Sequence, residues 1–250
     1  MITNSLIKVN RIIAFLIFIA MTASTFSQNN PASDKISTSA GDVEMYFIGH
    51  GSLMFKLNSF VIHIDPVSSS GNYDNLPKAD LILVTHEHYD HLDASLIEKL
   101  RKPETVLIGN QNGADKVKWA QTMKAGDKKV INNITVEAVP AYNIVNMRAP
   151  GSPFHPKGTG LGYILTIGEK KFYIAGDTEN TPEMKALKDI DVAFLPMNLP
   201  YTMTPEMVAD AARAFKPKIL YPYHYGDTDA EELVKLVKDT DITVRIRDLK

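Results

Sequence analysis

The sequence predicts an α/β fold in which helices cover the outer faces of two packed β-sheets. Short apolar runs rich in Val, Ile, Phe and Tyr alternate with segments whose apolar residues recur at helical spacing. The chain also divides into two halves of similar order, each with several strands followed by a helix, a strand and a second helix, although it contains no close repeat. Because the apolar face of a sheet must be covered, the two halves are expected to pack sheet against sheet, with the helices outside.

In the first half, three short strands precede one that is expected to be buried on both faces. In "FVIHID", Ile62 and Ile64 fall on one face and His63 on the other, where we expect His63 to pack within its layer. The run "LILV" within residues 79–85 is wholly apolar, as in a strand that is covered on both sides. The other elements expected here are strands at 43–48, 52–57 and 105–109, a helix at 94–101, and a helix or a loop with one turn at 112–123.

In the second half, two Thr-Pro pairs mark the starts of helices. Thr181 and Thr204 are candidate N-caps, and the proline that follows each suits the first helical position. These two helices are expected at 181–188 and 204–215. The other elements expected here are strands at 133–140, 161–167, 170–176, 191–196, 218–224 and 242–248, and a helix at 229–238.

Residues 1–27 have the layout of a secretory signal peptide. A basic start with Lys8 and Arg11 precedes ten apolar residues at 12–21, and small residues follow. Cleavage between Ser27 and Gln28 would release a periplasmic or extracellular protein without a stable membrane anchor. An uncleaved N-terminal anchor is the alternative, although the apolar run is shorter than the roughly 18–20 residues that span a bilayer.

The composition of the rest of the chain limits its partners and its sources of stability. Residues 28–41 are small and polar and predict a flexible leader, so the folded domain is expected at 42–250. The net charge is −2, and loss of the basic N-terminus would make the mature chain more acidic, which argues against a nucleic-acid partner. The chain has no cysteine, so even an exported protein must be stabilised by its core or by bound metal.

The segment "THEHYDH" follows the buried strand of the first half and carries four groups of the kinds that bind metals. His86 and His88 are two residues apart, so both side chains can point to one side, and Asp90 and His91 follow at once. Imidazole and carboxylate are common ligands of zinc. Four such groups in one short loop predict a metal site more readily than a set of solvated loop side chains.

Two distant residues support this interpretation. The strand "FYIAGDT" leads to Asp177, and the strand "ILYPYH" ends in His224. In α/β folds, functional groups gather where strands end. Taken singly, Asp177 could form a turn and His224 could be a buried structural residue, but their positions agree with the first motif.

With these motifs, the chain resembles the metallo-β-lactamase superfamily of hydrolases. The His-x-His-x-Asp-His signature of that superfamily matches residues 86–91, "HIDP" matches an upstream aspartate at Asp65, and "AGDT" and "PYHYG" match the positions of Asp177 and His224. The resemblance covers residues 42–250 and implies a four-layer αββα sandwich with metals at the open edge between the sheets. "GHGS" and "FHPKGTGLGYIL" resemble the branch of simple metal-dependent hydrolases, which is similar to L-ascorbate-6-phosphate lactonase and N-acyl-phosphatidylethanolamine phospholipase D.

The resemblance also implies a ligand set for two divalent ions. His86 and His88 would bind the first ion, Asp90, His91 and His224 the second, and Asp177 would bridge them. Zinc is the first choice for an imidazole-rich site, with manganese and iron as alternatives. The iron-dependent redox branch of the superfamily has Glu at the position of His88, so the chain departs from that branch.

The expected activity is hydrolysis of a small-molecule ester, lactone or phosphodiester. Two ions about 3.5–4 Å apart can hold a bridging hydroxide, which is the nucleophile, and Asp90 is the candidate to orient it. A sensor or binding module that keeps the metals without turnover is the alternative. A β-lactamase is disfavoured, because such enzymes lack the bridging aspartate and one large class of them uses a cysteine ligand, whereas this chain has Asp177 and no cysteine.

The chain departs from the superfamily pattern at the third ligand of the first ion. Relatives place a histidine after the central strand of the second half, where this chain has Asn143. We expect His155, on a Pro- and Gly-rich loop, to complete the first site, while Asn143 binds nothing or touches solvent and substrate. The alternative is that His155 remains free as a mobile proton donor.

Three further residues are candidates for positions around the metals. His50, in the glycine turn "GHGS", could contact the substrate or support a ligand, or could have no role beyond the turn. Asp65 is expected to orient a ligand rather than to bind metal itself. Tyr201 could line the pocket or could simply pack.

Overall fold

The structure, a computed structural model, describes residues 31–250. The signal peptide predicted over residues 1–27 lies outside the described residues and stays a prediction. Among the described residues, no helix is both long enough and apolar enough to cross a membrane.

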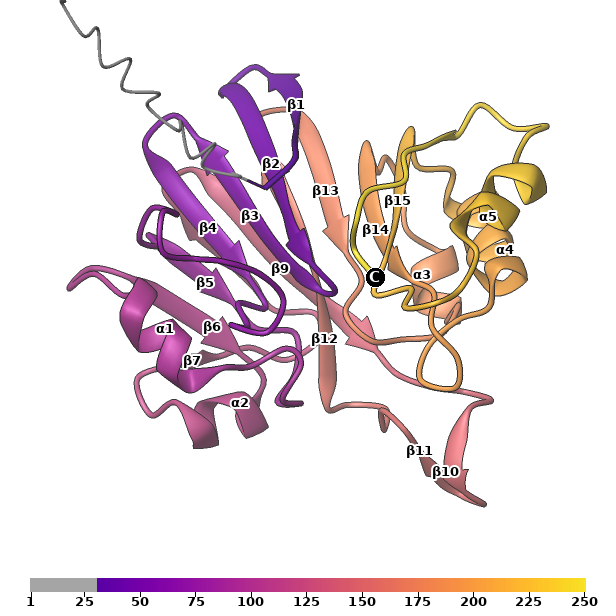
Figure 1. Ribbon diagram of the computed structural model, residues 1–250, viewed down its shortest axis with the longest axis horizontal. Helices are drawn as coiled ribbons and strands as arrows, with labels where there is room; N and C mark the ends of the chain where they lie inside the picture. The colour runs from indigo at the N-terminus through magenta and orange to yellow at the C-terminus, as the bar shows by residue number, and fades with distance from the viewer. Residues whose placement is uncertain (1–30) are drawn as a thin grey trace, which may run out of the picture. The chain divides into compact units, whose positions relative to one another are not determined.

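The first sheet contains seven strands that follow one another in chain order (Figure 1). The first four strands pair antiparallel, and the pairs from the fourth to the seventh strand are parallel. Two helices connect the parallel strands. The elements are β1 Ser33–Thr38, β2 Gly41–Gly49, β3 Ser52–Leu57, β4 Phe60–Ile64, β5 Leu81–Leu83, α1 Ala94–Leu100, β6 Val106–Gly109, α2 Gln111–Lys116 and β7 Gln121–Thr122.

The second sheet also has seven strands, in the order β16-β15-β14-β13-β12-β9-β8. Strands β13 to β16 pair in parallel and the others antiparallel. A separate two-stranded hairpin, β10–β11, which we call the arm, projects from the sheet (Figure 1). The elements are β8 Lys128–Ile131, β9 Ile134–Ala141, β10 Met147–Ala149, β11 Ser152–Pro153, β12 Gly160–Ile167, β13 Lys170–Ile174, α3 Pro182–Lys185, β14 Val192–Pro196, α4 Pro205–Phe215, β15 Ile219–Tyr223, α5 Ala230–Leu236 and β16 Thr243–Val244.

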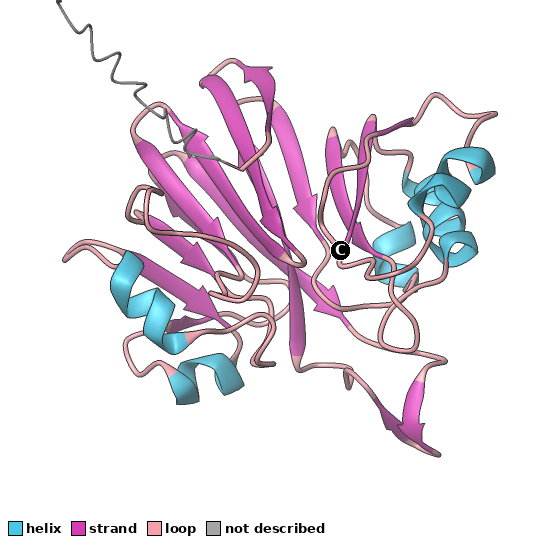
Figure 2. Ribbon diagram, viewed as in Figure 1, coloured by secondary structure: helices cyan, strands magenta, loops and turns pink. Residues whose placement is uncertain are grey.

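The predicted sandwich is confirmed, with the helices on the outer faces of the two sheets (Figure 2). Strand β5 shows how the layers are built. Leu81 and Leu83 lie in the core between the sheets, whereas Ile82 and Val84 pack in a second cluster with residues of α1. Alternate side chains of a strand point to opposite faces, so an apolar run is what this position requires.

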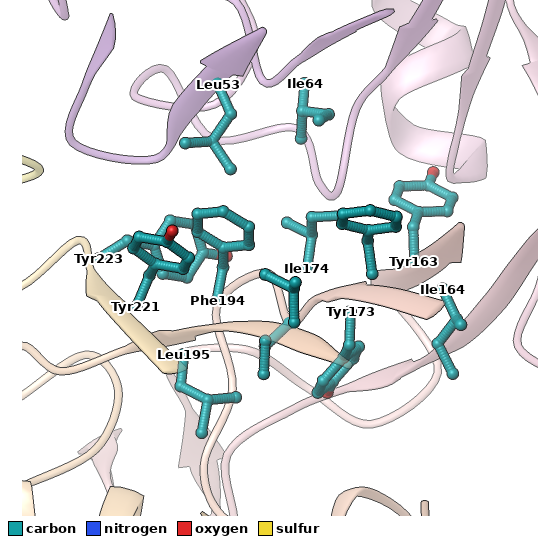
Figure 3. Packing of buried hydrophobic residues seen from close by; sticks show 14 of the residues in the cluster. Leu53, Ile64, Tyr163, Ile164, Tyr173, Ile174, Phe194, Leu195, Tyr221 and Tyr223 are labelled. Carbon is teal, nitrogen blue, oxygen red and sulfur yellow. The ribbon is translucent and has the colours of Figure 1, made fainter. Parts of the chain in front are cut away.

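Aromatic side chains of the second sheet fill much of the core between the sheets. Phe194 and Tyr221 are stacked with their ring centroids 4.9 Å apart, and Tyr221 lies 5.2 Å from Phe47 of the first sheet. Figure 3 shows Leu53 and Ile64 facing this layer from the other sheet. Large aromatic rings bury much apolar area, and here they contact residues of both sheets. The two sheets therefore share one core, which fixes the positions of the strand ends of one sheet relative to those of the other.

The two Thr-Pro pairs begin helices as predicted. The Thr204 hydroxyl accepts a hydrogen bond from the backbone N–H of Met207, and Thr181 does the same for Met184. The first helix is only four residues long, shorter than predicted, and the second runs to Phe215. Each cap satisfies a backbone donor that would otherwise lack a partner in the first turn.

The flexible leader predicted over residues 28–41 is wrong for the part that the structure describes. Ser33–Thr38 forms β1, an edge strand that pairs with β2. The Asp34 carboxylate accepts two hydrogen bonds from Arg247, at 2.7 and 2.6 Å, and a third from Arg245. Small polar residues resemble a linker in sequence, but backbone pairing and this distant ion pair hold them in the sheet.

Candidate metal centre

The predicted ligands gather because several of them directly follow strands that end at one edge of the molecule. His86, His88, Asp90 and His91 lie between β5 and α1, Asp177 follows β13, and His224 follows β15. Parallel strands such as β13 and β15 bring their carboxyl ends to the same edge of a sheet. His155 comes from the loop after the arm.

His86, His88 and His155 form the first group of nitrogen donors. Each offers one ring nitrogen, and these three nitrogens lie within 4.8 Å of one another. His86 Nε2 and His88 Nδ1 face each other at 3.1 Å. The structure therefore brings His155 to the position expected for the third ligand of the first ion.

Asp90, His91 and His224 form the second group, and His50 joins them. His224 Nε2 lies 3.6 Å from Asp90 Oδ2, and His91 Nε2 lies 4.0 Å from the same oxygen. The His50 ring lies 3.8 Å from the ring of His224, and its Nε2 is 3.4 Å from Asp90 Oδ2. His50 is therefore in contact with the site and is not an isolated turn residue.

The Asp177 carboxylate lies between the two groups. Its Oδ2 is 3.3 Å from His155 Nε2 on the side of the first group and 3.5 Å from His224 Nε2 on the side of the second. Its Oδ1 is 3.3 Å from His91 Nε2. A carboxylate in this position can contact an ion on each side.

Several buried nitrogen and oxygen atoms of the site make no hydrogen bond. These are Asp177 Oδ1, His91 Nε2 and both ring nitrogens of His224. A buried polar atom without a hydrogen bond destabilises the folded protein unless water, an ion or a ligand interacts with it. Nitrogen and oxygen lone pairs that converge in this way are the donors that divalent transition metals take, so the residues fit the metals that the sequence predicts.

Three of the histidines are held from behind by a neighbouring side chain. Asp65 Oδ2 lies 2.8 Å from His91 Nδ1, and Asn143 Oδ1 lies 2.8 Å from His155 Nδ1. The Thr85 hydroxyl, which donates to Asp65, is 3.1 Å from His86 Nδ1. With Nδ1 occupied, each ring directs Nε2 toward the centre, an arrangement that is common around metal-binding histidines.

Asn143 and His63 do not face the centre of the site. Asn143 was expected either to bind no metal or to touch solvent and substrate. Contact with solvent is wrong, because the side chain is buried and its oxygen lies 2.8 Å from His155 Nδ1, so that Asn143 orients His155. The prediction that His63 packs within its layer is confirmed. Its ring is buried 5.9 Å from that of Tyr73, and Nε2 donates to the Pro77 carbonyl oxygen at 3.0 Å.

Burial and neighbouring charges favour the protonation states that metal binding needs at His86, His155 and Asp177. At His91, burial would lower the pKa, but the charges of Asp177 and Asp65 outweigh it and raise the pKa well above its usual value, so an ion that binds there must displace a proton. Burial, and after it the charge of His91, lowers the pKa of His86 well below its usual value, and burial lowers the pKa of His155 to about 4. Burial would raise the pKa of Asp177, but the charges of His224 and His91 hold it well below its usual value. At neutral pH the two histidines are therefore uncharged and the carboxylate is ionised.

Three residues of the site have a backbone conformation that side chains usually avoid. His50, Asp65 and His224 have φ angles of 50°, 44° and 48°. Left-handed conformations are costly for residues other than glycine and persist where the surrounding structure holds them. Their occurrence at three positions around one centre shows that the fold enforces the placement of these side chains.

Glu179 was missed by sequence reasoning, although it lies only two residues after Asp177. Its buried carboxylate accepts hydrogen bonds of 2.7 Å from the backbone N–H groups of Ile144, Val145 and Asn146. It also accepts one of 3.1 Å from the Asn143 side chain. Glu179 thus anchors the segment that carries Asn143 and leads into the arm. In the sequence, Glu179 lies in the polar run "DTENTPE", where nothing local distinguishes it from the other acidic residues.

Replacing Glu179 by glutamine is expected to lower the free energy of unfolding by about 2–4 kcal/mol. Each Glu179 oxygen accepts two hydrogen bonds, and an amide keeps only one accepting oxygen, so two N–H donors would lose their partner, at about 1–2 kcal/mol each. Urea-induced unfolding measures the change. Glu183→Gln is the matched control, because its half-exposed carboxylate pairs with Lys157 and should cost at most about 1 kcal/mol. Equal losses for the two variants would contradict the anchoring role.

A cavity of about 920 Å³ opens above the donor groups. Its lining includes His50, His88, Asp90, His155, Asp177 and His224. Tyr201 lines it too and packs edge-on against Phe154, with ring centroids 5.1 Å apart, so both roles considered for it are realised. The cavity gives a small molecule access to the centre.

The fold and the convergent donors define a metal-dependent hydrolase of the metallo-β-lactamase type, and comparison with known proteins agrees. A β-lactamase superfamily domain matches residues 44–224. The chain belongs to the metallo-β-lactamase superfamily. It is similar to UPF0173 metal-dependent hydrolases, with 28% identity to that of Methanopyrus kandleri, over 80% of this chain and 94% of the relative. The Pyrococcus furiosus member is 32% identical, over 78% of this chain and 92% of the relative.

Solved structures show the same architecture. A protein from Parabacteroides distasonis, described as a metal-dependent hydrolase, is 49% identical with a TM-score of 0.84, over 88% of this chain and 99% of that one. Igni18, a metallo hydrolase from Ignicoccus hospitalis, shares the fold with a TM-score of 0.68 at 24% identity, over 83% of this chain and 95% of that one. The chain therefore belongs to a family of metal-dependent hydrolases.

Proposed function

We propose that the protein is an exported dinuclear metal-dependent hydrolase that acts on a small-molecule ester, lactone or phosphodiester. One observation carries the proposal. Two groups of donors meet at one carboxylate, and the buried atoms His91 Nε2, His224 Nε2 and Asp177 Oδ1 lie close together without making a hydrogen bond. Such a set suits two cations better than one, because its donors exceed what a single tetrahedral ion takes.

In this proposal, each ion has its own set of residues. His86, His88 and His155 hold the first, Asp90, His91 and His224 hold the second, and Asp177 bridges them. Zinc is the preferred ion for so many imidazoles, with manganese and iron as alternatives. When bound, such ions lower the pKa of water toward about 7 and polarise a carbonyl or phosphoryl oxygen.

The protein's own residues supply the orientation that this chemistry requires. Asp65, Thr85 and Asn143 hold the far nitrogens of His91, His86 and His155, so that the near nitrogens keep fixed directions. Asp90 Oδ2 lies at the cavity floor within 3.4 Å of His50 Nε2. In this position the ionised Asp90 can accept a hydrogen bond from water and so orient it, and His50 can hold the Asp90 carboxylate in place.

The test is hydrolysis of a panel of generic esters, lactones and phosphodiesters by the zinc-loaded protein. We expect turnover of at least one class, its loss with a chelator, and its recovery when zinc is restored. Absence of turnover across the panel, with two ions bound per chain, would refute the hydrolase and favour a metal-binding sensor. Antibiotic β-lactams belong in the panel as the disfavoured class.

Export is proposed from the sequence of residues 1–27, with its basic, apolar and small-residue parts in order. The mature protein is expected to begin at Gln28 and to occur in the periplasm or outside the cell. Mass spectrometry of the native protein checks this. An intact Met1 in a cytosolic fraction would contradict it.

A further inference from the structure

Arg148 is a cation without a carboxylate partner at the mouth of the cavity. It belongs to β10 of the arm, is exposed, and lines the cavity. The other four arginines of the described residues each pair with a carboxylate: Arg101 with Glu98, Arg213 with Asp239, and Arg245 and Arg247 with Asp34. Within residues 31–250, Arg148 alone among the arginines has no such pair. Asp248 lines the same cavity, yet no ion pair joins it to Arg148.

The guanidinium of Arg148 is nevertheless held in place. Its Cζ lies 5.4 Å from the ring centroid of Phe154, within the range of a cation–π contact. Phe154 in turn packs edge-on against Tyr201. The root of the arm is fixed by the hydrogen bonds of Glu179 to residues 144–146. A cation in this position keeps its donors free for a ligand.

Two exposed aromatic side chains, those of Tyr89 and Tyr201, line the same cavity. Six of the eight exposed large apolar residues within 31–250 belong to segments that border the cavity, and Val130 and Val234 are the other two. The six are Tyr89, Ile144, Val145, Met147, Leu199 and Tyr201. Tyr89 is 86% exposed and lies inside the metal-binding motif, where no packing role accounts for an aromatic ring. Clustered exposure of this kind marks a surface that binds something.

We propose that Arg148 binds an oxyanion of the substrate, a carboxylate or a phosphate, while Phe154 and Tyr201 contact an adjoining apolar group. The substrate class is then an amphiphilic anion whose scissile bond reaches the metal centre. This proposal rests on the proposed hydrolase function and adds the charge and the apolar character of the substrate. A guanidinium binds carboxylate and phosphate alike through paired N–H donors, so both are tested.

The first experiment compares matched substrates in the zinc-loaded protein. They are three esters of 4-nitrophenol with an acyl chain of similar length: the butyrate, which is neutral, the hemisuccinate, which carries a carboxylate, and the 3-phosphonopropanoate, which carries a phosphonate. Arg148→Gln should lower kcat/KM for an anionic substrate about tenfold, mainly through KM, because hydrogen bonds to charged groups are of this size. The neutral ester should change by less than about twofold, as expected for a site that it does not use.

Arg101→Gln is the matched control, because Arg101 also stacks on an aromatic ring, that of Trp119 at 4.3 Å, but does not line the cavity. It should leave all three substrates unchanged. Which anionic substrate responds to Arg148→Gln decides between a carboxylate and a phosphate. Equal losses on the neutral and anionic substrates, or no loss on any, would overturn the role of Arg148.

The second experiment measures binding without turnover. Phenylacetate, phenylphosphonate and the neutral phenylacetamide are titrated into metal-free and zinc-loaded protein by calorimetry. Arg148→Gln should raise the Kd of an anion about tenfold in both forms, with phenylacetamide unaffected. Phe154→Ala should weaken the binding of phenylacetate more than that of acetate, which is titrated as the ligand without an apolar group. An unchanged Kd in Arg148→Gln, or no binding of either anion to the original protein, would refute the proposal.

The two experiments separate the two proposals. Loss of anion binding in Arg148→Gln, in a protein that hydrolyses nothing, would support the oxyanion site and refute the hydrolase. Turnover that does not depend on the charge of the substrate, in a protein whose Arg148→Gln variant binds anions normally, would support the hydrolase and refute the oxyanion site.

Discussion

Replacing Asp177 by alanine is expected to abolish most activity and to release one of two bound ions. The carboxylate lies between both donor groups, so it can screen the repulsion of two cations and fix their spacing. Loss of a single electrostatic group in an active site costs about 10²–10³ in kcat, and loss of an ion should cost at least that. Elemental analysis and kcat on the best substrate measure the two effects.

Two further variants sharpen the test of Asp177. Asp177→Asn keeps the size of the side chain but removes its charge, so it should lose the ion as well. Asp115→Ala, at an exposed position of α2, controls for removal of a carboxylate in general. If Asp177→Ala kept two ions and full turnover, Asp177 would not be the bridge.

Removing His155 is expected to weaken the first site. In the proposed arrangement, His155 is one of three nitrogens within 4.8 Å of one another, so His155→Ala leaves only two histidines and Asp177 for that ion. The affinity of the first site should fall by more than about a hundredfold, since outer residues that merely orient ligands are worth about 10–100-fold. Competition with a chromophoric chelator measures the affinity of each site.

The competing role of His155, as a mobile proton donor, predicts a different result. Its loss would then leave two ions bound with unchanged affinity and reduce only the rate, which would end the ligand hypothesis.

Asn143→Ala distinguishes orientation from ligation. It removes the 2.8 Å contact to His155 Nδ1 but not the imidazole, so its effect on affinity should be the smaller of the two.

Much of the fold could be predicted because its signals are local. The apolar run before His86, the alternation around Ile62 and Ile64, and the Thr-Pro starts at Thr181 and Thr204 each specify an element through its nearest neighbours. The structure also brings together the predicted candidates His86, His88, Asp90, His91, Asp177 and His224. Strand ends in such folds converge, so a motif after one strand indicates where the others must meet.

The rest depends on partners far along the chain. Strand β1 is held by pairing with β2 and by the ion pair of Asp34 with Arg247, and neither is visible within a polar segment. Asn143 resembles a lost ligand until the fold places it behind His155. Glu179 acquires its function from backbone donors more than thirty residues away. Such roles are set by tertiary contacts, which composition and periodicity do not encode.

The positions of the proposed ligands along the chain bear on the stability of the folded protein. Four of the seven proposed ligands come from the first half of the chain, and His155, Asp177 and His224 come from the second. In the proposed arrangement, ions bound between them would act as reversible cross-links in a protein that has no cysteine and so no disulfide. An ion present at a thousand times its Kd stabilises the folded state by about 4 kcal/mol. The lifetime of the folded protein would therefore depend on the concentration of free metal around it. When metal is scarce, the protein would unfold and be degraded, so that its amount would fall as well as its activity.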